Sequence, residues 1–233
     1  MTTNFFGAEV AARYDRETAD MAVEPVVDFL AALAGDGAAL ELAIGTGRIA
    51  VPLVRRGVPV HGIDLSPDMV AKLREKPGSE SIGVTIGDFA TTRVDRTFTL
   101  VYLVFNTIGN LTTQEAQVAC FENVAAHLEP GGCFVIELRI HGGAPLEVFD
   151  LGESHVGVNE YDAATQRLVS HHFTLVDGGW VRNSVPFRSV SPEELDLMAR
   201  LAGMRLRERW AGWAREPFTA ESTQHVSVWE LAG

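Results

Sequence analysis

Two glycines and an acidic residue near position 45 have the types and spacing of a ligand-binding turn. Gly45 and Gly47 lie in the segment ELAIGTGR, directly after an apolar run that is typical of a buried strand. Such a pair lets the backbone bend tightly and leaves room for a ligand that a Cβ would fill. Glu41 stands near the carboxyl end of the same strand, where its carboxylate favours a cationic ligand group and disfavours a pyrophosphate.

Two more acidic residues follow at the ends of the next predicted strands. Asp64 lies 17 residues after Gly47, where a carboxylate can accept hydrogen bonds from both hydroxyls of a ribose. Asp88 stands beside Phe89 at the end of the third strand, and an acid next to an aromatic ring suits the amine and the face of an adenine. The three acids and the glycine pair together predict a nucleoside ligand.

Alternating strand and helix patterns predict the fold that brings these side chains together. Segments 38–45, 59–64, 82–89, 97–107 and 133–138 are typical of strands, and segments 25–35, 48–57, 67–76 and 114–128 are typical of helices. Because strand and helix alternate through short connections, the segments require a parallel sheet wrapped by helices. The expected class is therefore a doubly wound α/β fold.

The alternation stops beyond Arg139. Segments 167–176 and 180–190 read as two strands of a β-hairpin around the turn DGG, and no helix lies between them. We interpret residues 140–190 as an inserted β-rich roof over the substrate pocket, within a single domain of residues 1–233.

Two neighbouring histidines of this hairpin are candidates for a catalytic base. Period-two alternation places His171 on the apolar face of its strand and His172 on the polar face, so one of them is expected to point inward. Glu137, Arg139 and His141, near the end of the fifth strand, compete for the same role.

The order acid, glycine pair, acid, acid resembles that of class I methyltransferases that use S-adenosylmethionine. The segments GIDLSPDMV and LEPGGCFVIE, with the proline-glycine turn before the fifth strand, strengthen the resemblance, which covers roughly residues 38–138. It implies a Rossmann-like, mostly parallel sheet of seven strands with the hairpin inserted over the active site. Ala43 departs from the family, which commonly has glycine at this position. VFNTIGNL and SHHFTLVDGG also resemble segments of aminosugar N-methyltransferases, in which extra strands roof the active site.

The resemblance implies S-adenosylmethionine as the cofactor and gives a role to individual residues. Gly45 and Ala43 would approach the methionine moiety, Asp64 would hold the ribose, and Asp88 would meet the adenine amine. The residues expected to contact the cofactor are Tyr14, Glu41, Ala43, Gly45, Gly47, Asp64, Leu65, Met69, Asp88, Phe89, Val104 and Phe105. The methyl group of a sulfonium is already activated, so the protein has to align a nucleophile and exclude water, and no metal is required.

The composition of the chain limits the classes of molecule that it is expected to bind. The net charge of −12 opposes nucleic-acid binding, and it favours a small neutral or cationic methyl acceptor. No apolar run approaches the roughly 20 residues of a membrane helix, and no secretory signal is present, so we expect a cytoplasmic protein without a membrane partner. Cys120 and Cys133 lack metal-ligand spacing. A homodimer through the hairpin or the N-terminal helix is left open.

The leading interpretation is a methyltransferase acting on nitrogen or oxygen of a small metabolite or natural product. One alternative is a NAD-dependent oxidoreductase, because Gly45, Gly47 and Ala50 also satisfy the dinucleotide fingerprint. However, none of the three tyrosines is followed by lysine four residues later, as a common hydride-transfer pair would require. The other alternative is a non-catalytic cofactor-binding or scaffolding protein.

Overall fold

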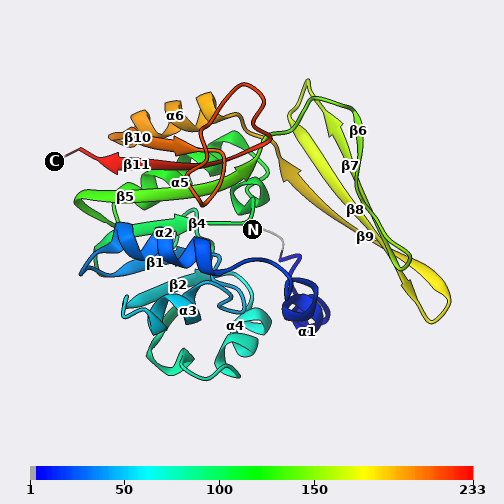
Figure 1. Cartoon of the computed structure of the whole chain (residues 1–233), viewed down its shortest axis with the longest axis horizontal. Coiled ribbons are helices and arrows are strands. Elements are labelled where there is room, and N and C mark those ends of the chain that lie inside the picture. The colour runs from blue at the N-terminus through cyan, green and yellow to red at the C-terminus, as the bar shows by residue number, and fades with distance from the viewer. Residues whose placement is uncertain (1–3, 233) are drawn as a thin grey trace.

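The computed structural model describes residues 4–232 and contains a large, mostly parallel sheet (Figure 1). Its strands are β1 (Ala39–Leu42), β2 (Val60–Asp64), β3 (Gly83–Ile86), β4 (Phe98–Leu103), β5 (Leu128–Arg139), β10 (Met204–Trp210) and β11 (Gln224–Leu231). They pair in the order β10-β11-β5-β4-β1-β2-β3. The five neighbouring strands β5, β4, β1, β2 and β3 are parallel to one another, and β11 is antiparallel to both of its neighbours, β10 and β5. The predicted doubly wound sheet of seven strands is confirmed.

Helices cover both faces of this sheet. They are α1 (Ala8–Glu17), α2 (Glu24–Ala34), α3 (Ala50–Arg55), α4 (Pro67–Arg74), α5 (Gln114–Ala125) and α6 (Pro192–Leu201), with 3₁₀ turns η1 (Ser79–Ser81) and η2 (Thr107–Asn110). One core joins Phe121 of α5 and Leu195 of α6 to the sheet, and a second core joins Leu30 of α2 and Leu53 of α3 to the opposite face. Because both faces are covered, the central strands are apolar on both sides, as in other parallel sheets.

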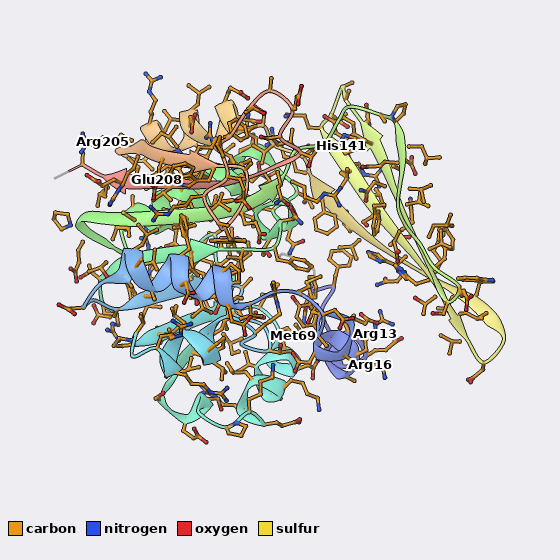
Figure 2. All side chains as sticks on the ribbon, in the orientation of Figure 1. Arg13, Arg16, Met69, His141, Arg205 and Glu208 are labelled. Carbon is orange, nitrogen blue, oxygen red and sulfur yellow. The ribbon has the colours of Figure 1, made fainter. Side chains whose placement is uncertain are left out.

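A second, antiparallel sheet follows β5. It consists of β6 (Leu146–Leu151), β7 (His155–Asp162), β8 (Arg167–Val176) and β9 (Gly179–Arg188), paired in chain order. Figure 1 shows it standing apart from the large sheet, on the side of the molecule where α1 also lies. His141 lies where the chain passes from one sheet to the other (Figure 2). The predicted hairpin corresponds to β8 and β9, and the inserted sheet is two strands larger than the sequence indicated.

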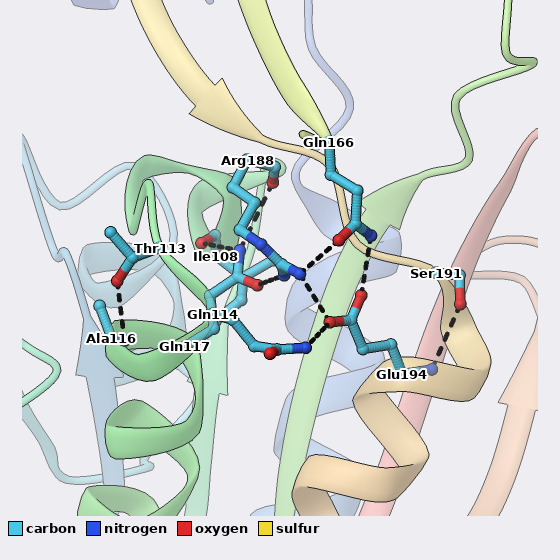
Figure 3. Close-up of polar contacts among 9 residues, drawn as sticks. All are labelled: Ile108, Thr113, Gln114, Ala116, Gln117, Gln166, Arg188, Ser191 and Glu194. Atoms are coloured by element: carbon cyan, nitrogen blue, oxygen red, sulfur yellow. Dashed lines mark hydrogen bonds and ion pairs between the residues drawn. The ribbon is translucent and has the colours of Figure 1, made fainter. Parts of the chain in front are cut away.

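A buried polar network attaches the second sheet to the helices (Figure 3). Arg188, at the end of β9, donates hydrogen bonds to Gln117 of α5, to Gln166 between β7 and β8 at 2.6 Å, and to Glu194 of α6 at 2.6 Å. Gln114 also donates to Glu194, at 2.6 Å. The Arg188 side chain is 6% exposed, so the ion pair is desolvated and depends on these hydrogen bonds.

No helix within residues 4–232 has the length and apolar character needed to cross a membrane.

Candidate functional site

The turn after β1 adopts a left-handed backbone at three alternate positions. The φ angles are 54° at Ala43, 56° at Gly45 and 73° at Gly47. A Cβ on Gly47 would lie 2.3 Å from Cδ1 of Leu73, so a larger residue would have to displace the Leu73 side chain as well as adopt the left-handed backbone. The turn stands where the strand order reverses between β1 and β4, which is the usual ligand position in such sheets.

The carboxylate of Asp64 holds this turn against the end of β2. Asp64 Oδ2 accepts a hydrogen bond from the Gly45 amide at 2.6 Å, and Oδ1 accepts one from the Ser66 amide at 2.7 Å. Burial raises the pKa of Asp64, and these two hydrogen bonds oppose the shift. A carboxylate has about four acceptor positions, so Asp64 keeps capacity for a ligand.

Glu41 is a buried acid directly beneath the turn. Glu41 is only 3% exposed, and its Oε2 accepts a hydrogen bond from the Tyr102 hydroxyl of β4 at 2.9 Å. Burial raises the pKa of Glu41 to about 8, against the opposing effects of the Tyr102 hydrogen bond and the Arg48 charge. Glu41 is therefore mostly protonated at neutral pH, and a cation placed beside it would favour the ionised form.

The N-terminal helix α1 is docked onto the same turn. Thr46 Oγ1 donates a hydrogen bond to Asp15 Oδ1 at 2.6 Å, and Lys76 pairs with Asp15 at 2.8 Å. Burial raises the pKa of the Tyr14 phenol, the nearby charge of Arg48 opposes this shift, and Glu41 adds to it. The predicted residues Tyr14, Glu41, Ala43, Gly45, Gly47 and Asp64 thus gather around one turn.

The residues expected around an adenine lie at the ends of β2 and β3. Met69 of α4 is 4% exposed, and its Cε is 3.3 Å from the position that a Cβ on Gly45 would occupy. Figure 2 shows Met69 beside α1, and Leu65 is half-buried. Asp88 Oδ1 accepts a hydrogen bond from the Ala90 amide at 2.9 Å. Phe89 is 6% exposed and packs within the core of the α5 and α6 face, so most of its ring contacts protein.

The chain after β4 completes the site. Val104 is buried, whereas Phe105 is 38% exposed with φ at 60°. The Phe105 amide donates to Glu137 Oε2 at 2.9 Å, and Glu137 Oε1 accepts from Trp213 Nε1 at 2.9 Å. The Arg48 guanidinium carbon lies 5.3 Å from the centroid of the Phe105 ring, within cation–π range.

Two residues that organise this site, Arg48 and Tyr102, were not identified from the sequence. Arg48 lies over the Phe105 ring and its charge acts on Tyr14 of α1, whereas Tyr102 supports Glu41. Glu137 was predicted only as a candidate base, and in the structure its carboxylate holds the strained Phe105 backbone. Arg48 directly follows the glycine turn, which is a usable signal. The Glu41–Tyr102 pair spans two strands 61 residues apart in the chain and leaves no local pattern.

The two candidate histidines of β8 lie on opposite faces of the second sheet. His171 Nδ1 is 2.8 Å from Ser184 Oγ and Nε2 is 3.3 Å from Glu160, on the face of the exposed Val148. His172 lies on the face of Tyr161, whose ring centroid is 4.2 Å from that of His141.

The face that carries His172 is turned toward α1. Burial lowers the pKa of His172, and the neighbouring His155 and Arg13 of α1 lower it further. Figure 2 shows Arg13 on α1. Within residues 4–232, no three His, Cys, Asp or Glu side chains come together in a way that could hold a metal ion.

Comparison with known proteins gives a consistent result. Residues 39–132 match a family model described as a methyltransferase domain. The chain is 30% identical over 202 residues to the cypemycin N-terminal methyltransferase of a Streptomyces species, covering 82% of each chain. It is also 30% identical over 152 residues to a dTDP-3-amino-3,4,6-trideoxy-alpha-D-glucopyranose N,N-dimethyltransferase of Streptomyces venezuelae, covering 60% of this chain and 62% of the relative.

The fold is similar to that of a solved methyltransferase structure over nearly the whole chain. The CcbJ methyltransferase of Streptomyces caelestis is 34% identical, with a TM-score of 0.88 over 98% of each chain. The agreement therefore includes the inserted sheet as well as the large one.

Proposed function

Because this chain belongs to the S-adenosylmethionine-dependent methyltransferases, we propose that it methylates an amine nitrogen on a natural product of the sugar or peptide type. The two curated relatives are named for nitrogen acceptors, an N-terminus in one and an aminosugar in the other. A peptide N-terminus is a cation at neutral pH, and the net charge of −12 favours the approach of such an acceptor. The comparisons support neither the NAD-dependent oxidoreductase nor the non-catalytic alternative.

The turn at residues 43–47 is the observation that carries this proposal. Its left-handed positions let the chain bend tightly after β1, and Asp64 clamps the Gly45 amide with one carboxylate oxygen. We assign the ribose to Asp64 and the positively charged methionine end to the neighbourhood of Glu41. Leu65, Met69, Asp88 and Phe89 would then surround the adenine, and Val104 and Phe105 would lie next to the methyl group.

The cofactor supplies a methyl group that a sulfonium has already activated. The protein residues have to hold the acceptor in line with the carbon–sulfur bond and exclude water, which contributes most of the rate when the nucleophile is a neutral amine. Tyr14 and α1 would cover one side of the bound cofactor, because Asp15 and Lys76 hold that helix against the turn.

Matched acceptor pairs test this proposal. The protein is incubated with S-adenosylmethionine and either an amine or a counterpart without a free amine. The two pairs are a dTDP-aminosugar with the dTDP-sugar that carries a hydroxyl group instead, and a peptide with a free N-terminus with the same peptide acetylated. Mass spectrometry should show methyl gain on at least one amine and on neither blocked counterpart. Methylation of either counterpart, or methylation of none of the four compounds, would contradict amine transfer. Calorimetric titration with S-adenosylmethionine and NAD should show binding of the first alone.

A further inference from the structure

Three side chains form a continuous hydrogen-bonded chain on the face of the second sheet that is turned toward α1. Asp150 Oδ2 lies 2.5 Å from His155 Nδ1, and His155 Nε2 lies 3.1 Å from His172 Nδ1. His172 Nε2 is then 3.3 Å from Ser170 Oγ. The chain therefore runs from an exposed carboxylate at the edge of the sheet to a half-buried imidazole near its middle.

The end groups fix the tautomer of both histidines. An ionised Asp150 only accepts, so His155 must carry its proton on Nδ1 and present an unprotonated Nε2. His172 then has to donate from Nδ1 to His155, which leaves the lone pair on His172 Nε2. The Ser170 hydroxyl can donate to that lone pair, and so could another protonated group.

We propose that Asp150, His155 and His172 form a proton relay that deprotonates the amine acceptor, an inference that rests on the proposed function. His172 is the general base, and its Nε2 takes one proton from the acceptor ammonium. The neutral amine then forms the nitrogen–carbon bond as the carbon–sulfur bond breaks, and the sulfur keeps the bonding pair. His155 and Asp150 are positioning residues, because they fix the tautomer of His172 and stabilise its charged form.

The surroundings of His172 suit this role. Its charged and titratable neighbours are His155, Arg13 of α1, Asp150 and His171, and of these only Asp150 favours the protonated ring. Burial, His155, Arg13 and His171 lower the pKa of His172 against the effect of Asp150, which favours the unprotonated ring that a general base requires. The ring of Phe149 meets His172 edge-on at 5.4 Å and restricts its rotation.

His171 provides a matched control in the next position of the same strand. It has hydrogen-bonding partners of its own, Ser184 and Glu160, but it lies on the opposite face and takes no part in the relay. A change that merely disturbs β8 should therefore act similarly at both positions, whereas a change in proton transfer should act at His172 alone.

The test compares His172→Gln, Asp150→Asn and His171→Gln with the parent protein on an amine acceptor that the parent methylates. We expect His172→Gln to lower kcat by roughly 10²–10⁴ and to remove the limb of the kcat/KM profile that rises with pH. Asp150→Asn should keep that limb but shift it to lower pH, because the ring loses the charge that stabilises its protonated form. His171→Gln should match the parent, and calorimetry should give the same S-adenosylmethionine affinity for all four proteins.

The outcomes separate this relay from the function on which it rests. A parent protein that methylates no amine contradicts the proposed function. A parent that methylates amines, together with a His172→Gln variant that keeps its rate and pH limb, overturns the relay alone. The relay is also overturned if His172→Gln and His171→Gln lose activity equally, or if His172→Gln loses cofactor affinity in step with its rate.

Discussion

Ala43 adopts a left-handed backbone with its φ at 54°, a conformation that costs an ordinary residue energy and costs glycine little. Ala43→Gly should therefore be tolerated. Relief of strain is offset by the extra freedom of glycine in the unfolded chain, so we expect changes within about 1 kcal/mol in both stability and cofactor affinity. Thermal unfolding and calorimetric titration measure the two. A large loss of affinity would show that the Ala43 methyl group contacts the cofactor productively.

Asp64 has a second role that its position in the sequence does not reveal, because it accepts hydrogen bonds from the Gly45 and Ser66 amides. We expect Asp64→Asn to weaken cofactor binding by about 1–3 kcal/mol, through the loss of charged hydrogen bonds. Calorimetry gives the affinity. A Ser66→Ala variant, which alters a neighbouring side chain and keeps the carboxylate, serves as the control. Unchanged affinity in Asp64→Asn would contradict the ribose assignment.

Glu41 should make the stability of the unliganded protein depend on pH. Its pKa is raised from 4.5 to about 8 by burial, so the folded state binds more protons than the unfolded state between these values. The contribution of Glu41 to stability is therefore present below about pH 4.5 and is lost as the pH rises toward about 8. Denaturant unfolding at pH 6.5 and pH 8 should show a smaller decrease for Glu41→Gln than for the parent.

If the cofactor brings a positive charge beside Glu41, binding should also release a proton near neutral pH. Calorimetry in two buffers of different ionisation enthalpy detects this proton, and Glu41→Gln should abolish the difference. Equal enthalpies for the parent protein in both buffers would place the charged end of the cofactor elsewhere.

The sequence predicted that most of the candidate cofactor residues lie at one edge of the sheet because each follows a strand whose apolar pattern is strong. Asp64 and Glu41 mark strand ends, and the glycines mark the turn between strand and helix. Tyr102 and Arg48 could not be assigned in this way. Tyr102 is the cross-strand partner of Glu41, and Arg48 acquires its role only when α1 folds onto the turn.

At the scale of the elements, the second sheet is joined to the first by polar contacts. Arg188 is buried and pairs with Glu194 of α6. Removing one partner of such a pair leaves the other charge uncompensated, so Arg188→Met should destabilise the protein by about 3–5 kcal/mol.

The same change should also displace the second sheet relative to the cofactor site. In the milder variant Glu194→Gln we expect the KM for the acceptor to rise while the Kd for S-adenosylmethionine stays constant. Steady-state kinetics and calorimetry measure the two values. An equal loss of both would mean that the network supports the large sheet instead.

The sequence predicted β8 and β9 but not β6 and β7. In β6 the register shifts between Val148 and Asp150, which breaks the alternation that would reveal a strand. Gly157 interrupts β7, where the Phe149 ring fills the space of a side chain. A register shift or a glycine within a strand weakens the alternation of apolar and polar residues from which a strand is predicted.

At the scale of the whole molecule, the large sheet followed from its pattern because every central strand is buried on both faces. The orientation of the second sheet did not follow, since alternation shows that His171 and His172 point in opposite directions and leaves open which of them faces inward. That choice depends on contacts between distant parts of the chain, such as His141 with Tyr161 and the packing of Phe187 close to Gly109.

The inserted sheet is one uninterrupted stretch of chain, from Leu146 to Arg188, and none of the residues assigned to the cofactor lies within it. Acceptor choice could therefore diversify among descendants of one ancestral gene while methyl-donor recognition stayed fixed. Replacing residues 140–190 by the equivalent segment of a relative should transplant acceptor preference and preserve affinity for S-adenosylmethionine. Such a chimera must retain arginine at position 188 and glutamine at position 166, since these two side chains belong to the hydrogen-bond network that attaches the inserted segment to α5 and α6.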